Sequence, residues 1–384
     1  MPRSSLTRSH HSITTVDKKA YIFGGLTSQG RLASADLHSI ALEGPTVGPA
    51  ASQYQLLPAI PVEKGGPIPS PRHSHAACAL GSSIVVIGGR DENERLLDDG
   101  HQVWMYDTEK LAWDTLEPTS HLERLPPPRS EAKLFHYDSN LVLYGGKGEH
   151  GSFLADAWHF DSSAKTWNQL PTAPVATTSA ALFGSILYLI SGSDDLSSQV
   201  HILEIKLYSE QPSSWKTLSF PTNPLVPGPR SRENGGLLPV TTGYGRNFLL
   251  YFLGARREPT KLDQEGASLT GDGILSKWDD VWTFQLPSGN VEFKTTNTIS
   301  EAVKPAKIKD QIRLKLGIDT GNSSWAEVDI HPPEKDQRHE GKINPGPRSH
   351  FGCCLTTDGR GVVVWGGLDA EGRRCGDGWI IQLH

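Results

Sequence analysis

The sequence contains few sulfur-containing residues and no long hydrophobic run, and these absences exclude several classes of protein. Its 384 residues include 4 cysteines and 2 methionines. No C-x-x-C pair occurs, so neither a disulfide framework nor a zinc ribbon is indicated. No stretch approaches the roughly 18 apolar residues of a membrane span. The polar N-terminal residues Met1–Ser9 lack the apolar stretch of a signal peptide. We therefore expect a cytoplasmic protein.

The chain also lacks a strong excess of either charge. The 37 Lys and Arg residues stand against 43 Asp and Glu, for a formal net charge of −6. This balance argues against nucleic acid or an anionic membrane as a partner. Glycine and proline, in contrast, are abundant, with 39 and 27 residues. This composition predicts many turns, short strands and little helix.

One sequence unit recurs six times. In full it consists of Pro-Arg, an apolar strand ending in Gly-Gly, a variable loop, a strand with an aspartate and an aromatic residue, and Trp-x-x-Leu. The fourth copy lacks Pro-Arg, and Ser191 and Leu253 replace the first glycine in the fourth and fifth copies. The clearest copy contains Arg72, the pair Gly88-Gly89, Trp113 and Leu116. The six copies span approximately residues 8–58, 71–118, 128–171, 177–221, 229–332 and 347–384 with 1–8, within a single domain of residues 1–384.

Each copy predicts a four-stranded antiparallel sheet that cannot bury both faces alone. Six such sheets packed around an axis bury them against each other, so the sequence predicts an all-β, six-bladed propeller. The sixth copy ends before its Trp-x-x-Leu strand, and we expect Ser4–Arg8 to complete it beside Gly378–Leu383. In the fifth-copy insertion, Pro305–Leu316 followed by Gly317 fits a short helix. Apolar alternation from Ile312 onward also fits a strand.

These units resemble kelch repeats across nearly the whole chain, which implies a kelch β-propeller without an added BTB or F-box domain. Gly88–Asn93, and Trp278–Trp282 beside a long insertion, resemble free-standing kelch propellers of the nitrile-specifier and epithiospecifier type and their fungal relatives. That resemblance implies that Arg90 grips an anionic sulfate. The iron ligands of those proteins follow Glu-x-x-x-Asp-x-x-x-His, and Gly254–Asp263 departs from this pattern. We therefore predict no metal and no cofactor.

Two sets of loops are expected to meet at one opening of the propeller, and both carry cations. The loops after the glycine pairs supply Arg90 and Lys147. The Pro-Arg loops and their counterpart in the first copy supply the repeat arginines Arg8, Arg72, Arg129, Arg230 and Arg348. The residue two positions after each repeat arginine is expected nearest the axis: His10, Ser74, Glu131, Arg232 and His350. Guanidinium groups hold carboxylate, sulfate or phosphate by paired hydrogen bonds. The repeat arginines can equally bridge neighbouring blades through backbone carbonyls or an aspartate.

These features predict a binding protein whose arginine-rich opening holds an anionic small molecule or an acidic protein segment. The predicted ligand-binding residues are Arg90, Arg232, Arg72, Arg129, Arg230, Arg348, Lys147, His10 and His350. The alternative is a non-redox enzyme, such as an isomerase, cyclase or lyase, acting on a small specialised metabolite by positioning and electrostatics. No catalytic residues are identified, because no H-E-x-x-H, G-x-S-x-G or P-loop motif occurs.

Overall fold

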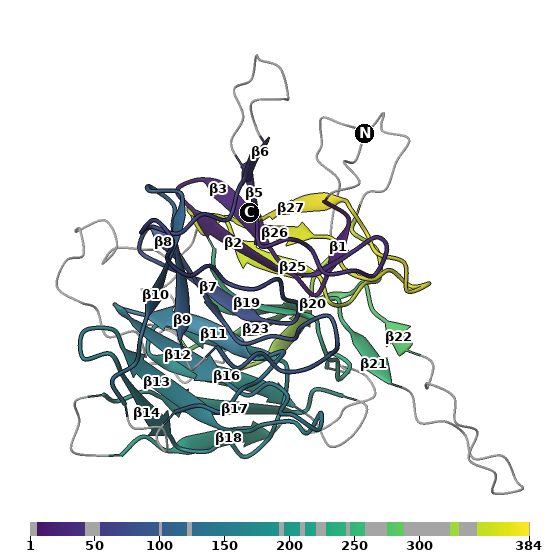
Figure 1. Cartoon of the computed structure of the whole chain (residues 1–384). Helices are drawn as coiled ribbons and strands as arrows, with labels where there is room; N and C mark the ends of the chain where they lie inside the picture. The colour runs from purple at the N-terminus through teal and green to yellow at the C-terminus, as the bar shows by residue number, and fades with distance from the viewer. Residues whose placement is uncertain are drawn as a thin grey trace, which may run out of the picture.

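Six small antiparallel sheets, the blades, are arranged around a central channel (Figure 1). The computed structural model describes residues 6–42, 54–99, 102–120, 125–191, 196–207, 212–219, 228–242, 246–257, 275–287, 323–329 and 344–383. Within these residues every element is a strand or a short turn, and no α-helix occurs. The predicted all-β, six-bladed fold is confirmed. Pro305–Leu316, for which a helix or a strand was expected, lies outside the described residues.

The strands of each blade follow one another from the axis outward in chain order. Blade 1 has β2 (Ser12–Val16), β3 (Lys19–Phe23), β5 (Leu37–Ala41) and β6 (Tyr54–Leu57), and blade 2 has β7 (Ala76–Leu80), β8 (Ser83–Ile87), β9 (Val103–Asp107) and β10 (Ala112–Leu116). Blade 3 has β11 (Lys133–Tyr137), β12 (Asn140–Tyr144), β13 (Ala157–Asp161) and β14 (Thr166–Leu170), and blade 4 has β15 (Ala180–Phe183), β16 (Ile186–Ser191), β17 (Gln199–Glu204) and β18 (Trp215–Ser219). Blade 5 has β19 (Gly236–Thr241), β20 (Asn247–Phe252), β23 (Val281–Gln285) and β24 (Trp325–Glu327), and blade 6 has β25 (Gly352–Leu355), β26 (Gly361–Trp365) and β27 (Gly378–Gln382). Two small hairpins pair β1 (Arg8–Ser9) with β4 (Leu26–Thr27), and β21 (Ala255–Arg257) with β22 (Leu275–Lys277).

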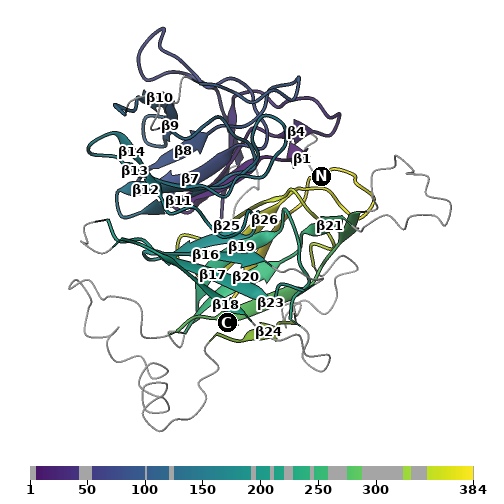
Figure 2. The ribbon, with the colours of Figure 1, turned by 90° about the horizontal axis from the view of Figure 1, so that it is seen from below.

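The innermost strands of the blades form a closed ring. β7 contacts β2 and β11, β15 contacts β11 and β19, and β25 contacts both β19 and β2 (Figures 1 and 2). The contact between β25 and β2 joins the last blade to the first. These six strands therefore surround the channel without a break.

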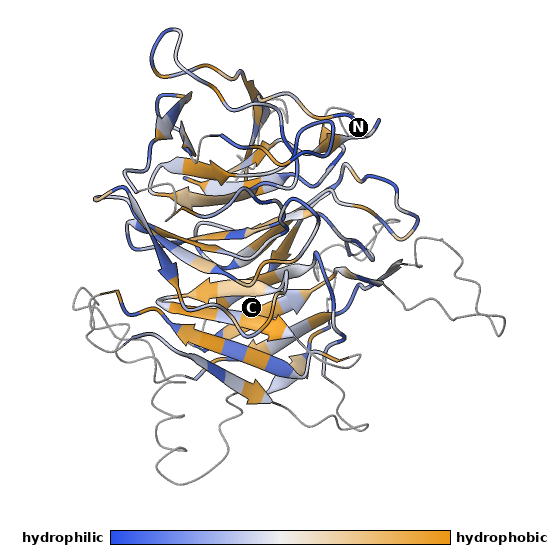
Figure 3. Ribbon diagram, turned by 60° about the horizontal axis from the view of Figure 1, so that its bottom comes forward, coloured by the Kyte–Doolittle hydropathy of each residue, from blue (hydrophilic) through white to orange (hydrophobic). Residues whose placement is uncertain are grey.

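The hydrophobic core is divided into six clusters, one at each interface between neighbouring blades. Between blades 1 and 2, for example, the ring centroids of Phe23 and Tyr106 lie 5.1 Å and 5.2 Å from that of Trp113. Apolar and polar residues alternate along many of the strands, as the orange and blue bands in Figure 3 show. Because both faces of a blade are buried against neighbours, the repeat tryptophans such as Trp113 and Trp167 serve as packing between sheets.

The paired glycines allow adjacent blades to approach closely. Gly88 and Gly89 have φ of 65° and 107°, and the Gly89 N–H donates to the Arg129 carbonyl of the next blade at 2.9 Å. A Cβ on Gly88 would lie 2.3 Å from that carbonyl oxygen. The same bond joins Gly25 to Arg72, and Gly367 to Arg8. Only glycine combines the positive φ with this close approach.

Gly88→Ala should destabilise blade 2 well beyond the cost of its backbone conformation. Gly81 in the same blade has φ of 59°, but a Cβ added there would meet nothing within 4 Å. Gly81→Ala should therefore cost about 1 kcal/mol for positive φ alone, whereas Gly88→Ala should cost about 2–3 kcal/mol, because the Arg129 carbonyl must also move. Urea denaturation of both variants tests this. Equal costs would show that the close approach is unimportant.

Closure of the ring at the last blade differs from the prediction that Ser4–Arg8 pair beside Gly378–Leu383. Arg8 and Ser9 pair with Thr27 and Leu26, not with β27, and among the described residues β27 pairs only with β26. Instead, the Arg8 carbonyl accepts from Gly367 at 2.8 Å, and the Arg8 N–H donates to Cys375 at 3.0 Å. The first blade thus docks on the last by the contact that joins other blades. Ser4 and Ser5, which the prediction also included, lie outside the described residues.

Candidate functional site: the propeller opening

One end of the channel is framed by equivalent residues from consecutive blades. His10, Ser74, Glu131, Asn234 and His350 all have φ between 51° and 58°. Their backbones form a chain of hydrogen bonds: Glu131 N–H to Ser74 at 2.7 Å, Ser74 to His10 at 2.8 Å, His10 to His350 at 2.9 Å, and His350 to Asn234 at 3.2 Å. Asn234 N–H donates to Thr178 Oγ1 of blade 4 at 3.1 Å. This arrangement, the opening ring, brings one side chain from each of these blades to the channel mouth.

Two histidines of the opening ring are held uncharged near neutral pH. The His10 and His350 rings lie 4.1 Å apart, and His350 Nε2 is 2.9 Å from Asn234 Nδ2. Burial, followed by the nearby His350, lowers the pKa of His10 to about 2. Burial also lowers the pKa of His350 to about 4, with added effects of Lys147, Lys277 and Lys133. Both rings therefore offer hydrogen bonds rather than charge to a ligand.

Four arginines from the predicted binding set lie inside the propeller wall, and the prediction that they line the opening is wrong. Arg72, Arg129, Arg232 and Arg348 are between 0% and 3% exposed. Each pairs with an aspartate, as Arg72–Asp99 at 2.6 Å, Arg129–Asp156 at 2.7 Å, Arg232–Asp280 at 2.6 Å and Arg348–Asp377 at 3.1 Å. Each also donates to the carbonyl at the end of its own second strand. These guanidinium groups thus bind the carbonyls and aspartates that the alternative prediction named, but they do so within their own blade and do not bridge two blades.

The fifth blade uses a different arginine from the one expected. Arg232, not Arg230, occupies the wall position, and its Nη1 donates to the Leu253 carbonyl at 3.0 Å. Asn234 consequently takes the place in the opening ring that had been assigned to Arg232. Arg230 is exposed and lies 4.9 Å from the Trp278 ring. The shift arises because the Pro229-Arg230 dipeptide lies two residues before the structural position.

Arg90 and Lys147 do lie at the rim of the opening, and both already have partners. Arg90 Nε donates to Ser130 Oγ at 3.0 Å, so this half-buried side chain spans blades 2 and 3. Lys147 Nζ lies 2.8 Å from Glu131 Oε2 and 5.0 Å from the Phe153 ring. A ligand carboxylate would compete with Glu131 for Lys147, while Arg90 keeps part of its guanidinium edge at the surface.

Below the opening ring, the channel forms a cavity of about 440 Å³. It is lined by the innermost strands of all six blades, with small residues such as Ala77 and Cys78 on β7. Lys133 extends into it from β11, and its charge acts on His350 and Cys353 of blade 6, across the ring. Burial raises the pKa of Cys353 to about 11, so this thiol remains protonated. The channel can therefore hold a small or extended ligand beside a lysine.

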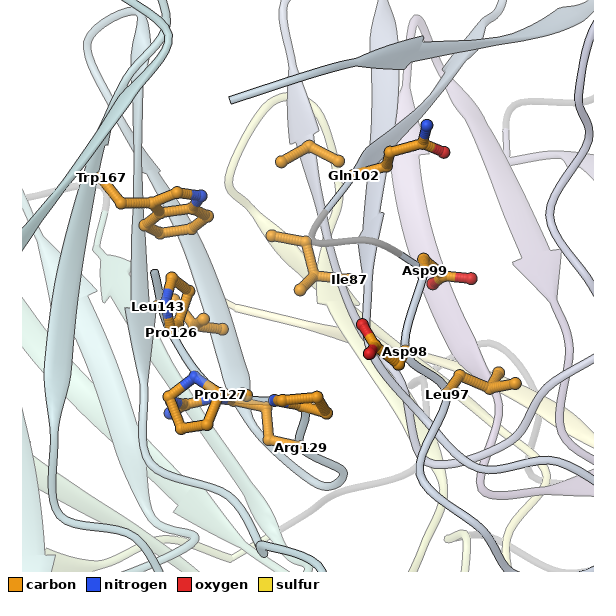
Figure 4. Close-up of a pocket in the computed structure, with 13 residues that line it drawn as sticks. Ile87, Leu97, Asp98, Asp99, Gln102, Pro126, Pro127, Arg129, Leu143 and Trp167 are labelled. Atoms are coloured by element: carbon orange, nitrogen blue, oxygen red, sulfur yellow. The ribbon is translucent and has the colours of Figure 1, made fainter. Parts of the chain in front are cut away.

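A second, much smaller cavity lies between blades 2 and 3. Its volume is about 40 Å³, and it is lined among others by Asp98, Asp99, Pro127, Arg129 and Trp167 (Figure 4). Such a volume has room for water rather than for a ligand. No group of three or more His, Cys, Asp or Glu side chains within the described ranges is arranged to hold a metal ion. In the part of the chain that the structure describes, no helix is long and apolar enough to cross a membrane.

The structure thus gathers part of the predicted set and adds residues that were missed. His10 and His350 lie in the opening ring, Lys147 contacts that ring through Glu131, and Arg90 binds Ser130 next to Glu131. The four wall arginines and Arg230 have no such contact among the described residues. The missed residues are Lys133, Asn234, Lys277 and Arg374. Arg374 Nε donates to Ser9 Oγ at 3.1 Å, beside His10. The signal for Lys133 was its position two residues beyond Glu131 at the start of an innermost strand, where side chains two apart share a face.

Comparison with known proteins identifies repeat-containing relatives. Residues 10–237 match the model of the KLHDC2/KLHL20/DRC7 Kelch-repeats domain. Kelch domain-containing protein 3 of Homo sapiens is 28% identical over 169 residues, which cover 42% of this chain and 40% of that protein. An F-box/kelch-repeat protein of Arabidopsis thaliana is 26% identical over 378 residues, which cover 94% of this chain and 66% of that protein. The solved structure of YjhT has a TM-score of 0.61 at 14% identity and covers 100% of this chain and 97% of its own, which shows the likeness of fold.

Several relatives are much longer than the matched region. The chain spans 4% of the flagellar outer arm dynein alpha chain of Chlamydomonas reinhardtii, at 24% identity, and 6% of host cell factor 1 of Homo sapiens, at 31% identity. The similarity therefore concerns a small part of each of these proteins.

Proposed function

Because this chain belongs to the kelch-repeat family, we propose that it is a binding propeller whose opening holds an acidic segment of a partner protein or an anionic small molecule. The name host cell factor, shared by several relatives, is compatible with action through protein contacts. The site itself consists of the opening ring, the rim cations Arg90, Lys147, Lys277 and Arg374, and Lys133 in the channel below.

The observation that carries this proposal is the convergence of three lysines on His350. Lys133 and Lys147 come from blade 3, and Lys277 comes from the β21–β22 hairpin of blade 5. Burial is the main cause of the lowered pKa of His350, and the charges of all three lysines lower it further. Lys147 is neutralised by Glu131, but within the described residues neither Lys133 nor Lys277 has a carboxylate partner. Both are only half-buried, so water and ligands reach them.

Uncompensated cations at a concave opening attract anions more strongly than the same charges on a convex surface. The walls have low dielectric constant and focus the field into the opening. The chain as a whole carries a formal charge of −6, so a local positive site differs in sign from its surroundings. An anionic ligand that enters is oriented by the lysines, and the neutral His10 and His350 complete its hydrogen bonding.

Arg90 extends the proposal to small oxoanions. In the resemblance to nitrile-specifier propellers this residue faces a sulfate, and a role in specialised metabolism belongs to the same hypothesis. Arg90 lies at the rim, where its Nη2 is 3.4 Å from the Gly148 carbonyl, a weak contact that a ligand can replace. Glu258 and Asp263, the nearest carboxylates to the iron-ligand pattern, lie outside the described residues. The four cysteines are free, which is compatible with the cytoplasmic location that we include in the proposal.

Reversing a channel charge should weaken binding of an acidic peptide. With a fluorescent hexaglutamate peptide as the probe, Lys133→Glu should raise Kd at least tenfold, about 1.4 kcal/mol, because a like charge would face the ligand. Lys216→Glu, the same charge change on the exposed outer strand β18, should alter Kd less than twofold. Fluorescence anisotropy at 50 and 200 mM salt measures both, and binding should weaken with salt.

The proposal fails if the folded wild-type chain does not bind the probe, or if both substitutions change Kd equally. Lys133→Gln is a milder companion that removes the charge without adding a carboxylate. It should fall between wild type and Lys133→Glu, and circular dichroism checks that all variants remain folded.

A further inference from the structure

The sixth blade is short of one strand within the described residues. Blades 1 to 5 each have four strands, but the sheet of blade 6 consists of β25, β26 and β27. β27, in yellow in Figure 1, is therefore at the outer edge of its sheet, and its outward backbone groups have no strand partner among these residues. Third strands in the other blades are covered on this side by a fourth.

Side-chain exposure shows the same gap. Ile380 on β27 is 48% exposed. Its equivalent on β13, His159, is paired with β14 and is only 4% exposed. Edge strands that remain uncovered usually carry charged residues or proline, which discourage pairing with other chains. The β27 sequence, Gly-Trp-Ile-Ile-Gln, carries neither. It has the composition of an inner strand in an edge position.

We infer that the open edge of β27 binds an extended segment of a partner protein that carries an aromatic-x-x-leucine pattern, added as a fourth strand of blade 6. The other blades define this chemistry. In each of blades 1 to 5 the fourth strand places an aromatic ring opposite the third strand, in the pairs Tyr54–Ile40, Trp113–Tyr106, Trp167–Phe160, Trp215–Leu203 and Trp325–Phe284.

The register of the missing strand follows from that of its neighbours. In blade 3, Phe160 lies opposite Leu141 on one side and Trp167 on the other, and Leu170 lies opposite Ala157. In blade 6, Ile381 lies opposite Val362 in the position of Phe160, and Gly378 takes the position of Ala157. An antiparallel partner strand thus places its aromatic residue opposite Ile381 and its leucine opposite Gly378. Backbone hydrogen bonds supply affinity, and the two side chains supply specificity.

The first described residues of the chain contact other strands than β27. Residues 1–5, Met-Pro-Arg-Ser-Ser, contain no aromatic residue and include a proline. Leu6 is 6% exposed, and its carbonyl accepts from Trp365 Nε1 at 2.9 Å on the inner strand β26. Arg8 and Ser9 pair with β4. The first described residues are thus engaged on β26 and β4, and we assign the edge of β27 to a segment of another protein.

A labelled peptide with the sequence of residues 164–171, Ala-Lys-Thr-Trp-Asn-Gln-Leu-Pro, tests this inference on the full chain. It should bind in fluorescence anisotropy, and a version with serine in place of Trp and Leu should bind at least tenfold more weakly. Ile380→Lys should weaken binding of the first peptide at least tenfold. Leu56→Lys, at a 53% exposed position on the fourth strand β6, should not. Hydrogen exchange should show protection of Ile380–Gln382 on binding.

Each other outcome overturns the assignment. Absence of binding to the wild-type chain, or equal loss in both lysine variants, removes the site from β27. If binding appears only after deletion of residues 1–5, the chain's own N-terminus covers the edge. If the wild-type chain dimerises and Ile380→Lys abolishes the dimer, a second copy is the occupant. Binding of hexaglutamate at the opening should be unchanged by Ile380→Lys, so this test is independent of the proposed function.

Discussion

Arg129→Met is expected to destabilise the propeller by about 3–5 kcal/mol, since it leaves a partly buried carboxylate without its partner. Arg129 is 2% exposed and forms paired hydrogen bonds with Asp156 at 2.8 and 2.7 Å. It also donates to the Gly145 carbonyl at 2.9 Å and the Pro127 carbonyl at 3.0 Å. Methionine fills a similar volume but satisfies none of these acceptors, and urea denaturation measures the loss.

The ionisation of Asp156 depends directly on this arginine. Burial alone would raise the pKa of Asp156, but hydrogen bonds from Arg129 and Trp158, together with the Arg129 charge, hold it below its ordinary value. In Arg129→Met the pKa of Asp156 should therefore rise. Arg373→Met is the matched control, because Arg373 is 73% exposed in its ion pairs with Asp369 and Glu371. Its denaturation midpoint should hardly change, since exposed ion pairs contribute little.

A small effect of Arg129→Met would contradict the structural role of the wall arginines. Such a result would instead support the prediction that these guanidinium groups are available to ligands. If the variant is strongly destabilised but, while still folded, binds hexaglutamate as the wild-type chain does, then stability and binding depend on separate sets of cations.

The fold could be predicted from the sequence because its information is repeated. Four blades carry a glycine pair, and every blade carries aromatic residues and turn signals. Blade 4 is recognisable from Tyr188 and Trp215 even without an arginine. In that blade Thr177 takes over part of the arginine's role, since its Oγ1 donates to the Ile190 carbonyl at 2.9 Å. Six imperfect copies define the architecture more firmly than any one motif.

The site was harder to predict because it depends on register within single loops. The Pro-Arg dipeptide suggested Arg230, but spacing favoured Arg232, which lies 21 residues before Leu253. The corresponding bonds from Arg72 and Arg129 span 16 residues. Asn234 was a second signal, since asparagine tolerates the positive φ of the opening ring. A displacement of two residues moved a charge from the predicted opening into the wall.

Contacts across the channel could not be inferred from local sequence at all. Lys133 and His350 lie on opposite blades and are 217 positions apart in the chain. Their proximity follows from the diameter of a six-membered ring of strands. Sequence periodicity indicates which face of a strand a lysine shares, but not which distant residue it meets.

The protein should lose several kcal/mol of stability between pH 6.5 and 4.5, the range in which the histidines of an unfolded chain become protonated. Burial and the Arg8 charge lower the pKa of His11 to about 3. Burial lowers the pKa of His75 well below its ordinary value. The pKa values of His10, His38 and His350 are lowered to about 2, 4 and 4, with burial as the main cause. The folded chain therefore keeps these rings neutral.

The sign of the effect follows from proton binding. In the unfolded chain a histidine has a pKa of about 6.5, so it binds a proton as the pH falls below that value, whereas the folded chain does not. Protons thus favour unfolding, and each fully buried histidine contributes up to about 1.4 kcal/mol of lost stability per pH unit. The stability that depends on the neutral ring is complete above pH 6.5. It disappears as the pH falls through the folded-state pKa.

His11→Phe isolates one of these histidines. Phe351 occupies the same position in blade 6, three residues after Arg348 as His11 is after Arg8, so the fold accommodates an aromatic ring there. Between pH 6.5 and 4.5 the variant should lose about 2.3 kcal/mol less than the wild-type chain, because over this range the unfolded-state histidine completes its proton uptake and the folded-state His11 binds almost none. Urea denaturation at pH 7.5, 6.5, 5.5 and 4.5 measures both slopes. Parallel curves for His11→Phe and wild type would mean that His11 titrates normally in the folded chain. The tight packing of the His11 ring against Gly352 and Gly366 of the last blade would then not exclude a charged ring.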